Sequence, residues 1–289
     1  MDELPDARLL LTCDRRERIE IVAGAASLHG LQRVREAASG AAASSEPLLQ
    51  AAGALALGAL GIDDAESRDR LSLAAGRLVG SADPGVREAV AEALGMCSTD
   101  GRMTLPLLLL ADDSDPTVRL AAVQGLSVPA DDEPEDGGVV AVVLLRRFAD
   151  PEPDVRDFAV FALGVNRDVD GPALRDALFE RLDDNGAGTS GEAAVALARR
   201  GDRRVLPALT RHLAHEDVGN LWVEAAAELG EPTLLPALLS LRDAGWAQDD
   251  ARPQVLEDAI RACRRMGLHG MAAEESDTPE RLEDGRRDG

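Results

Sequence analysis

The sequence predicts an all-α fold, a right-handed α-solenoid of about seven to eight helical hairpins. A segment that begins with an acid and a proline recurs as SADPGVREAVAEALG (81–95), SDPTVRLAAVQGL (114–126) and PEPDVRDFAVFALG (151–164). The residues that close these Ala-rich segments recur every 32 to 37 residues, and such a period is the signature of stacked repeats. Strand signals are nearly absent, because even VVAVVLL (139–145) falls where the period places a helix. The closing residues are Leu28, Leu60, Leu94, Leu126, Leu163, Leu197, Leu229 and, more weakly, Met266.

Each clear repeat begins with signals for the start of a helix. An acid precedes a proline, and these residue types suit the N-cap and the first helical position. A valine and an arginine follow. We expect the recurrent acid and arginine to form a ladder that ties adjacent units together. The residues with this structural role are Asp83, Arg87, Asp115, Arg119, Glu152 and Arg156.

A second helix follows a short break in each repeat, so each unit is a helical hairpin. Three second helices share a Leu-Pro start, and proline is tolerated in the first turn. We expect residues 1–16 to form an N-terminal segment, 17–268 the solenoid, and 269–289 an acidic, disordered tail. Residues 39–47 are predicted as a flexible loop, and 129–138 as an acidic insertion.

The D-P-x-V-R starts, the Ala-Leu-Gly ends and the second helices ending in Leu-x-Asp resemble the HEAT repeat, in the short form of the phycocyanobilin-lyase-like family. The resemblance covers roughly residues 17–268 and is clearest in 81–184. It implies an adaptor or assembly platform. In a curved stack of hairpins we expect an inner face, formed by the second helices, to offer a long surface for another protein.

The composition is acidic and free of lysine, with a formal net charge of −22 and a sequence pI of about 4.5. It resembles that of proteins from salt-loving archaea, whose carboxylate-rich surfaces stay soluble at molar salt. A GC-rich genome that encodes Arg in place of Lys is the alternative. Such a surface argues against nucleic acid and anionic membranes as partners. The scattered Cys13, Cys97 and Cys263 and the lack of a long apolar run predict a cytoplasmic protein with reduced thiols.

No residue is predicted to be catalytic, to bind a cofactor or to ligate a metal. His212 and His215 share a helix with neighbouring acids, but no distant ligand of the right type completes a metal site. The cysteines have no local base, and nucleophile or nucleotide motifs are missing. The Gly-rich string NGAGTSGEA (185–193) follows no strand and is predicted to be a loop rather than a phosphate cradle.

The candidate partner-binding residues lie where the repeat pattern breaks. They are Arg146, Arg147, Arg199, Arg200, Arg203, Arg204, Arg211 and Trp222. Arg and Trp are enriched at interface hot spots, and all Phe and Trp residues lie between 148 and 246. The alternative is a solvated face paired to nearby acids, with Trp222 filling the core.

The function predicted from these observations is a non-enzymatic scaffold that needs no cofactor and binds another protein, with an adaptor in signalling or taxis as one instance. A bilin-lyase-like enzyme or a small-molecule-binding HEAT protein is the alternative.

Overall fold

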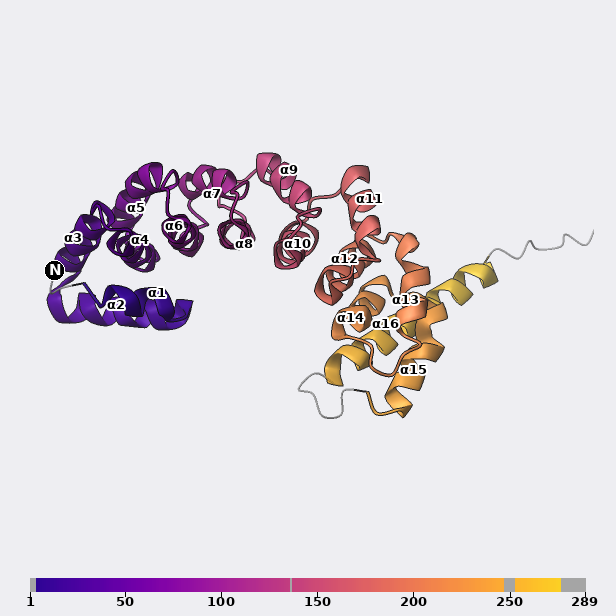
Figure 1. Cartoon of the computed structure of the whole chain (residues 1–289). Helices are drawn as coiled ribbons and strands as arrows, with labels where there is room; N and C mark the ends of the chain where they lie inside the picture. Colours follow the sequence, from indigo (N-terminus) through magenta and orange to yellow (C-terminus); the bar gives the residue numbers. More distant parts are fainter. Residues whose placement is uncertain (1–3, 136, 247–252, 277–289) are drawn as a thin grey trace, which may run out of the picture. The chain divides into compact units, whose positions relative to one another are not determined.

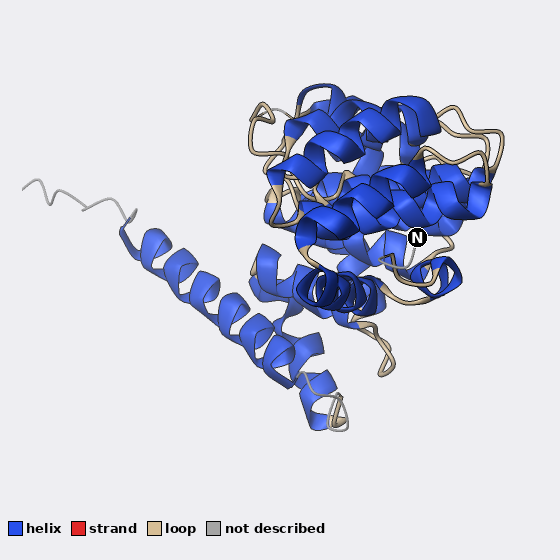
Figure 2. Cartoon of the chain, turned by 90° about the vertical axis from the view of Figure 1, so that its left-hand side faces the viewer, coloured by secondary structure: helices blue, strands red, loops and turns tan. Residues whose placement is uncertain are grey.

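A computed structural model describes residues 4–135, 137–246 and 253–276 of the chain. These residues form helices and connecting loops and contain no strand (Figure 2). The predicted all-α fold is therefore confirmed. The chain divides into two compact units, unit 1 (Met1–Ala193) and unit 2 (Ala194–Gly289), and each is described by itself.

Unit 1 is a row of helical hairpins preceded by one short helix. Its helices are α1 (Ala7–Thr12), α2 (Arg15–His29), α3 (Leu31–Ala42), α4 (Pro47–Gly61), α5 (Ala65–Leu78), α6 (Pro84–Met96), α7 (Thr104–Leu110), α8 (Pro116–Gly125), α9 (Gly138–Arg147), α10 (Pro153–Val160) and α11 (Pro172–Arg181). A 3-10 turn, η1 (Gly101–Met103), leads into α7, and a π turn, η2 (Phe161–Val165), extends α10. The next helix, α12 (Ala187–Arg199), begins in unit 1 and ends in unit 2.

The predicted helix starts agree with the structure at all three clear repeats, since α6, α8 and α10 begin at Pro84, Pro116 and Pro153. The Asp83 side chain accepts hydrogen bonds from the Gly85 and Val86 amides, and Asp115 accepts one from the Thr117 amide. Both are N-caps followed by proline at the first position. Glu152 precedes α10 but makes no side-chain capping bond, so the third start depends on its proline and on the helix dipole.

The helices of unit 1 form two layers (Figure 1). The first helices of the repeats, α4, α6, α8 and α10, lie on the inner side of the curve, and α3, α5, α7, α9 and α11 lie on the outer side. The expectation that the second helices line the inner face is therefore wrong. The reason is the size of the residues where the first helices meet. A Cβ atom at Gly58 would lie 2.7 Å from the Ala93 Cα, and one at Gly95 would lie 3.0 Å from the Gly125 Cα. Such contacts let the first helices approach closely, so their layer takes the shorter side of the curve.

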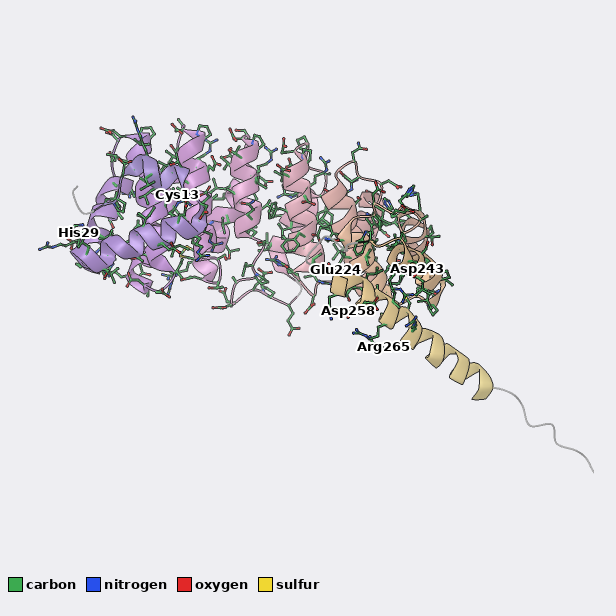
Figure 3. The ribbon with its side chains drawn as sticks, turned by 90° about the horizontal axis from the view of Figure 1, so that it is seen from below. Cys13, His29, Glu224, Asp243, Asp258 and Arg265 are labelled. Carbon is green, nitrogen blue, oxygen red and sulfur yellow. The ribbon has the colours of Figure 1, made fainter. Side chains whose placement is uncertain are left out.

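The N-terminal end of unit 1 is closed by α1 and α2, which both contact α4. Helix α4 is consequently covered on all sides, and every residue from Ala51 to Gly61 is buried. Arg18 of α2 is buried as well, and its guanidinium donates to the Leu10 carbonyl at 2.8 Å and to Glu92 of α6 at 2.7 Å. Figure 3 labels Cys13, which follows α1, and His29 at the end of α2.

Two segments predicted as loops are partly helical. Residues 39–42 belong to α3, and α12 begins at Ala187, inside the Gly-rich string 185–193. In the second case Asp184 accepts a hydrogen bond from the Gly186 amide at 2.9 Å and so supports the helix start. The alanines that follow favour a helix more than the glycines oppose it.

Unit 2 continues the pattern of hairpins. Its elements after α12 are η3 (Arg203–Val205), α13 (Leu206–His212), α14 (Asn220–Leu229), η4 (Pro232–Leu234), α15 (Leu235–Asp243) and α16 (Pro253–Ser276). The rings of His212 and Trp222 stack at 3.7 Å, and the Trp246 indole donates to the Val218 carbonyl at 2.8 Å. Helix α16 extends beyond residue 268 to Ser276, and 277–289 lie outside the described residues. The predicted domain bounds stay a prediction.

Candidate functional site: the arginine ladder and the inner face

The predicted arginine ladder exists in unit 1, and each arginine grips one aspartate with two hydrogen bonds. Arg87 donates from Nε and Nη2 to Asp113 at 2.7 and 2.8 Å, and Arg119 donates to Asp150 at 2.9 and 2.8 Å. Arg156 repeats this geometry on Asp184 at 3.1 and 3.0 Å. Two parallel bonds of this kind give a strong and directional ion pair.

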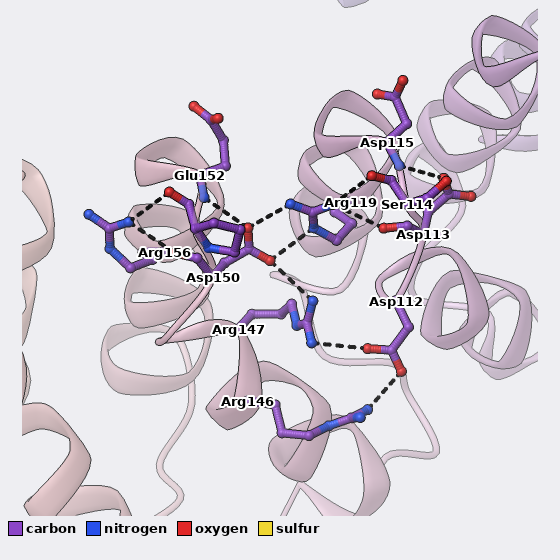
Figure 4. A network of polar contacts seen from close by, with 11 residues as sticks. Asp112, Asp113, Ser114, Asp115, Arg119, Arg146, Arg147, Asp150, Glu152 and Arg156 are labelled. Atoms are coloured by element: carbon purple, nitrogen blue, oxygen red, sulfur yellow. Dashed lines mark hydrogen bonds and ion pairs between the residues drawn. The ribbon is translucent and has the colours of Figure 1, made fainter.

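The ladder joins the loops that precede successive first helices (Figure 4). The third nitrogen of Arg119, Nη1, donates to the Asp113 carbonyl at 3.0 Å, and that of Arg156 donates to the Asp150 carbonyl at 2.9 Å. In turn, the Asp150 carboxylate accepts the Glu152 amide at 3.0 Å. Each arginine therefore holds the loop before its own helix and the loop before the next one.

The acids that complete the ladder are not the predicted ones. Asp83 and Asp115 cap their own helices, and Glu152 lies directly before α10. The partners are instead Asp113, Asp150 and Asp184, each of which lies three residues after the end of a second helix. Each ladder aspartate accepts a backbone amide of its own loop and still binds the arginine of the preceding unit.

The ladder carboxyls are held in their charged form. Hydrogen bonds from Arg87 are the main reason why the pKa of Asp113 is lowered. Burial alone would raise the pKa of Asp150, but the bonds from Arg119 and from the Glu152 amide outweigh it and lower the pKa. These charges are inside the protein, with Arg119 8% and Asp150 3% exposed. The ladder is therefore a structural device, and its atoms are not available to a ligand.

The predicted partner-binding arginines already contact groups of this chain. Arg146 and Arg147 lie in unit 1 and reach Asp112 at 2.9 and 3.2 Å. In unit 2 three arginines form ion pairs: Arg199 with Glu228 at 3.1 Å, Arg203 with Glu231 at 2.7 Å, and Arg204 with Asp202 at 2.7 Å. Arg200 donates a hydrogen bond to the Ala196 carbonyl at 2.8 Å.

The last two candidates differ in exposure. Arg211 is exposed. Trp222 is only 5% exposed and stacks on His212, so it packs in the core of unit 2. A binding role for these residues stays a prediction.

A different surface, which the sequence analysis missed, lies along the first helices of unit 1. We call it the inner face and define it by the residues of α6, α8 and α10–η2 that are left unburied on the solvent side. They are Glu88, Glu92, Gly95, Thr117, Leu120, Gln124, Asp154, Asp157, Phe158 and Phe161. Glu88, Leu120 and Asp157 each follow a ladder arginine directly, so an alignment of the repeats on those arginines would have revealed the stripe.

The inner face combines carboxylates with apolar side chains. Burial raises the pKa of Glu88, and the neighbouring carboxylate of Glu92 adds to the effect. Burial also raises the pKa of Asp157, with further contributions from Asp154 and Asp184. The Asp157 Oδ1 atom is buried without a hydrogen-bond partner and lies 2.5 Å from where a Cβ of Gly188 would be. Burial and neighbouring carboxylates thus disfavour the charged forms of Glu88 and Asp157, whereas Arg18 compensates the charge of Glu92 at 2.7 Å.

The described residues offer little material for catalysis or metal binding. They include no group of three or more His, Cys, Asp or Glu residues placed to hold a metal ion. Burial raises the pKa of the Cys97 thiol and of the Cys263 thiol to about 11. Thiols with such a pKa are protonated at neutral pH and are weak nucleophiles. Across the described part of the chain, no helix has both the length and the apolar character needed to cross a membrane.

The layered hairpins, their period and the arginine ladder define a HEAT-repeat protein. Residues 34–127 and 141–229 match the family of HEAT repeats, and the chain belongs to that family. Among known proteins it is similar to protein YibA of Escherichia coli (strain K12), with 35% identity over 130 residues, which cover 45% of this chain and 44% of that protein. The matched part is thus less than half the length of this curated relative.

Solved structures show the same architecture. The X-ray structure of YibA is similar over 91% of this chain and 92% of that chain, with a TM-score of 0.68 and 26% identity. Kap121p bound to Pho4p has a TM-score of 0.50 at 13% identity over 90% of this chain and 34% of that chain. An engineered protein has a TM-score of 0.56 at 18% identity over 90% of this chain and 77% of that chain. The last two likenesses concern the fold alone.

Proposed function

We propose that this protein is a non-enzymatic scaffold that holds another protein against the inner face of unit 1. The observation that carries the proposal is the composition of that face. Carboxylates such as Glu88 and Asp154 stand beside the partly exposed apolar side chains of Leu120, Phe158 and Phe161. Apolar contacts within a charged border are the usual anatomy of a protein interface. The π turn that carries Phe161 adds support, because such turns are frequent at functional sites.

The chemistry of the inner face selects a partner with cationic and apolar side chains. The carboxyls of Glu88 and Asp157 have raised pKa values because they are partly buried near other carboxylates. An Arg or Lys of the partner would stabilise their charged forms, and its apolar neighbours would cover Leu120 and Phe161. Electrostatic complementarity of this kind favours specificity and rapid association. The same charge disfavours nucleic acid and anionic membranes as partners.

The test is capture of a partner from native cells by two matched variants. Phe161→Glu places a charge at an apolar position of the inner face. The control, Leu28→Glu, makes the same kind of change at a side chain of α2 that is 78% exposed. We expect wild type and Leu28→Glu to retain the same partner in stoichiometric amount, and Phe161→Glu to lose it. A partner that both variants retain equally, or no partner with either, contradicts the proposal.

We further propose that the chain is a halophilic member of the short, phycocyanobilin-lyase-like HEAT group, acting as an adaptor in the cytoplasm, with signalling or taxis as the candidate process. The support is the net charge of −22, the lack of lysine and the repeat motifs. Stability should then rise with KCl into the molar range, as measured by thermal unfolding, because salt screens the repulsion among carboxylates. Unfolding that is indifferent to KCl would contradict the halophilic part.

The bilin-lyase-like or small-molecule-binding alternative makes a separate prediction. Purified protein would then be coloured, or it would change the absorbance of an added bilin. A scaffold predicts an unchanged bilin spectrum.

A further inference from the structure

The outer layer of unit 1 carries an exposed apolar stripe. We define the outer stripe as the large apolar side chains of α5, α7, α9 and α11 that are between 43% and 74% exposed. They are Leu73, Leu105, Leu109, Val139, Val142 and Phe179. Because 29% of the chain is charged and the net charge is −22, such a series needs an explanation. Apolar side chains scattered singly are normal, but a contiguous set marks an interaction site.

The stripe runs along the outer layer because three of its members occupy equivalent places in successive repeats. Leu73, Leu105 and Val142 follow one another at intervals of 32 and 37 residues, which are also the intervals between the closing leucines Leu94, Leu126 and Leu163. The helices that carry them are neighbours in the outer layer (Figure 1). They are also linked in register by ion pairs, because Arg102 before α7 pairs with Asp69 of α5, and Arg146 of α9 pairs with Asp112 after α7.

The charges around the stripe are balanced, in contrast to the protein as a whole. The pairs that border it are Glu66–Arg70, Asp69–Arg102, Asp112–Arg146 and Asp170–Arg175. The excess of carboxylates therefore lies on other surfaces, the inner face among them. Two copies of this chain repel each other least where such balanced pairs face each other.

The area of the stripe is sufficient for a modest interface between identical copies. Six large apolar side chains exposed to this extent present on the order of 500 Å² of apolar surface. This area is near the upper end of the range for the largest apolar patch on a typical monomer. Two such patches together bury on the order of 1,000 Å², the lower bound for a specific interface. An isologous two-fold contact would use the same patch on both subunits.

We propose that the outer stripe is a self-association surface, through which a second copy of this chain binds face to face. The inner faces of both copies stay free in this arrangement, so the dimer would present two partner-binding surfaces. The proposal is independent of the proposed function, since it concerns the opposite layer of unit 1. The net charge makes association dependent on salt, with tighter dimers at molar KCl than at low ionic strength.

Sedimentation velocity of the full chain over a series of concentrations tests the proposal. We expect a monomer–dimer equilibrium that shifts toward dimer as KCl rises. The double variant Leu105→Glu/Leu109→Glu should weaken dimerisation by about tenfold or more, because each copy brings like charges into the shared contact. Leu28→Glu, which changes an even more exposed side chain outside the stripe, should dimerise as wild type does. Circular dichroism confirms that the variants keep their helix content.

Three results overturn the proposal. The wild type could stay monomeric at every concentration and salt, the double variant could dimerise like wild type, or Leu28→Glu could lose the dimer as the double variant does. If the wild type is monomeric and the double variant loses a different protein captured from cells, the stripe binds that protein and not a second copy. The partner-binding role of the inner face is tested separately, because Phe161→Glu should abolish partner capture and leave the dimer intact.

Discussion

The two layers of unit 1 are built from the same repeat but differ in residue size and in charge. The inner layer has glycine and alanine at its helix contacts and carboxylates with raised pKa values on its open side. The outer layer has exposed Leu, Val and Phe side chains bordered by balanced ion pairs. One repeat thus produces two chemically distinct surfaces, because the two helices of a hairpin present different residues to the solvent. The inner layer fits a cationic partner, and the outer layer fits a neutral, apolar one.

The ladder at the starts of the inner helices gives the largest expected effect. Arg119→Ala removes both hydrogen bonds of the main partner of the 3% exposed Asp150. Because Arg147 still reaches Asp150 at 3.1 Å, we expect a loss of about 3 kcal/mol in the free energy of unfolding, the lower end for a broken buried pair. Chemical denaturation measures it. Arg16→Ala removes an exposed pair with Glu20 and should cost no more than about 1 kcal/mol. Equal losses in the two variants would show that the ladder is not a buried structural device.

Lowering the pH should weaken the same ladder. The pKa values of Asp113, Asp150 and Asp184 are lowered in the fold, so their contribution to stability is present above the ordinary Asp pKa of about 3.9. It is lost as the pH falls below that value toward the lowered pKa. Denaturation curves at a series of acidic pH values should show a smaller loss for Arg119→Ala than for wild type. Parallel losses would contradict this assignment.

A methyl group distinguishes the close inner contacts from the open outer surface. Gly58→Ala puts a Cβ 2.7 Å from the Ala93 Cα, so the helices must shift, and we expect a loss of about 1–3 kcal/mol. Gly76→Ala on outer helix α5 has no atom within 4 Å and should instead stabilise the protein by about 0.5–1 kcal/mol. Thermal unfolding of both variants gives the sign directly. A gain for both would mean that the inner helices are not packed closely.

Removing a carboxylate from the inner face should stabilise the fold. The pKa of Asp157 is raised, so its ionised form is disfavoured in the folded state at neutral pH. Asp157→Asn is therefore expected to raise the unfolding temperature at pH 7. The gain should shrink as the pH falls through the raised pKa toward the ordinary Asp value, where both states are protonated. Asp154→Asn, on the exposed part of the same helix, serves as the control. A destabilised Asp157→Asn at neutral pH would contradict the account.

Much of the fold could be predicted because short local sequence signals mark where the helices of each repeat begin and end. Pairs of an acid and a proline, together with the closing leucines, placed α6, α8 and α10, and the period identified α9 as a helix despite its run of valines. The role of Arg87, Arg119 and Arg156 was also predicted, but their partners were not. Which carboxylate faces each arginine depends on how the loops before successive inner helices are placed, and only the three-dimensional structure reveals this.

The layer assignment and the candidate surfaces were harder to predict for a related reason. Which helix layer becomes the inner one depends on pairs such as Gly58 with Ala93 and Gly95 with Gly125, which are contacts between helices. The arginine clusters at 146–147 and 199–204 stood out in the sequence, but nearby carboxylates pair with most of them. The inner face did not stand out, because its residues are spread one or two per repeat.

Site-specific photo-crosslinking in native cells tests the central claim most directly, namely that the two layers bind different partners. A photoreactive residue replaces Phe161 on the inner face in one variant and Leu109 on the outer stripe in another. The account predicts that the probe at 161 captures another protein and that the probe at 109 captures a second copy of this chain. Capture of the same protein at both positions, or of this chain from 161, would contradict it.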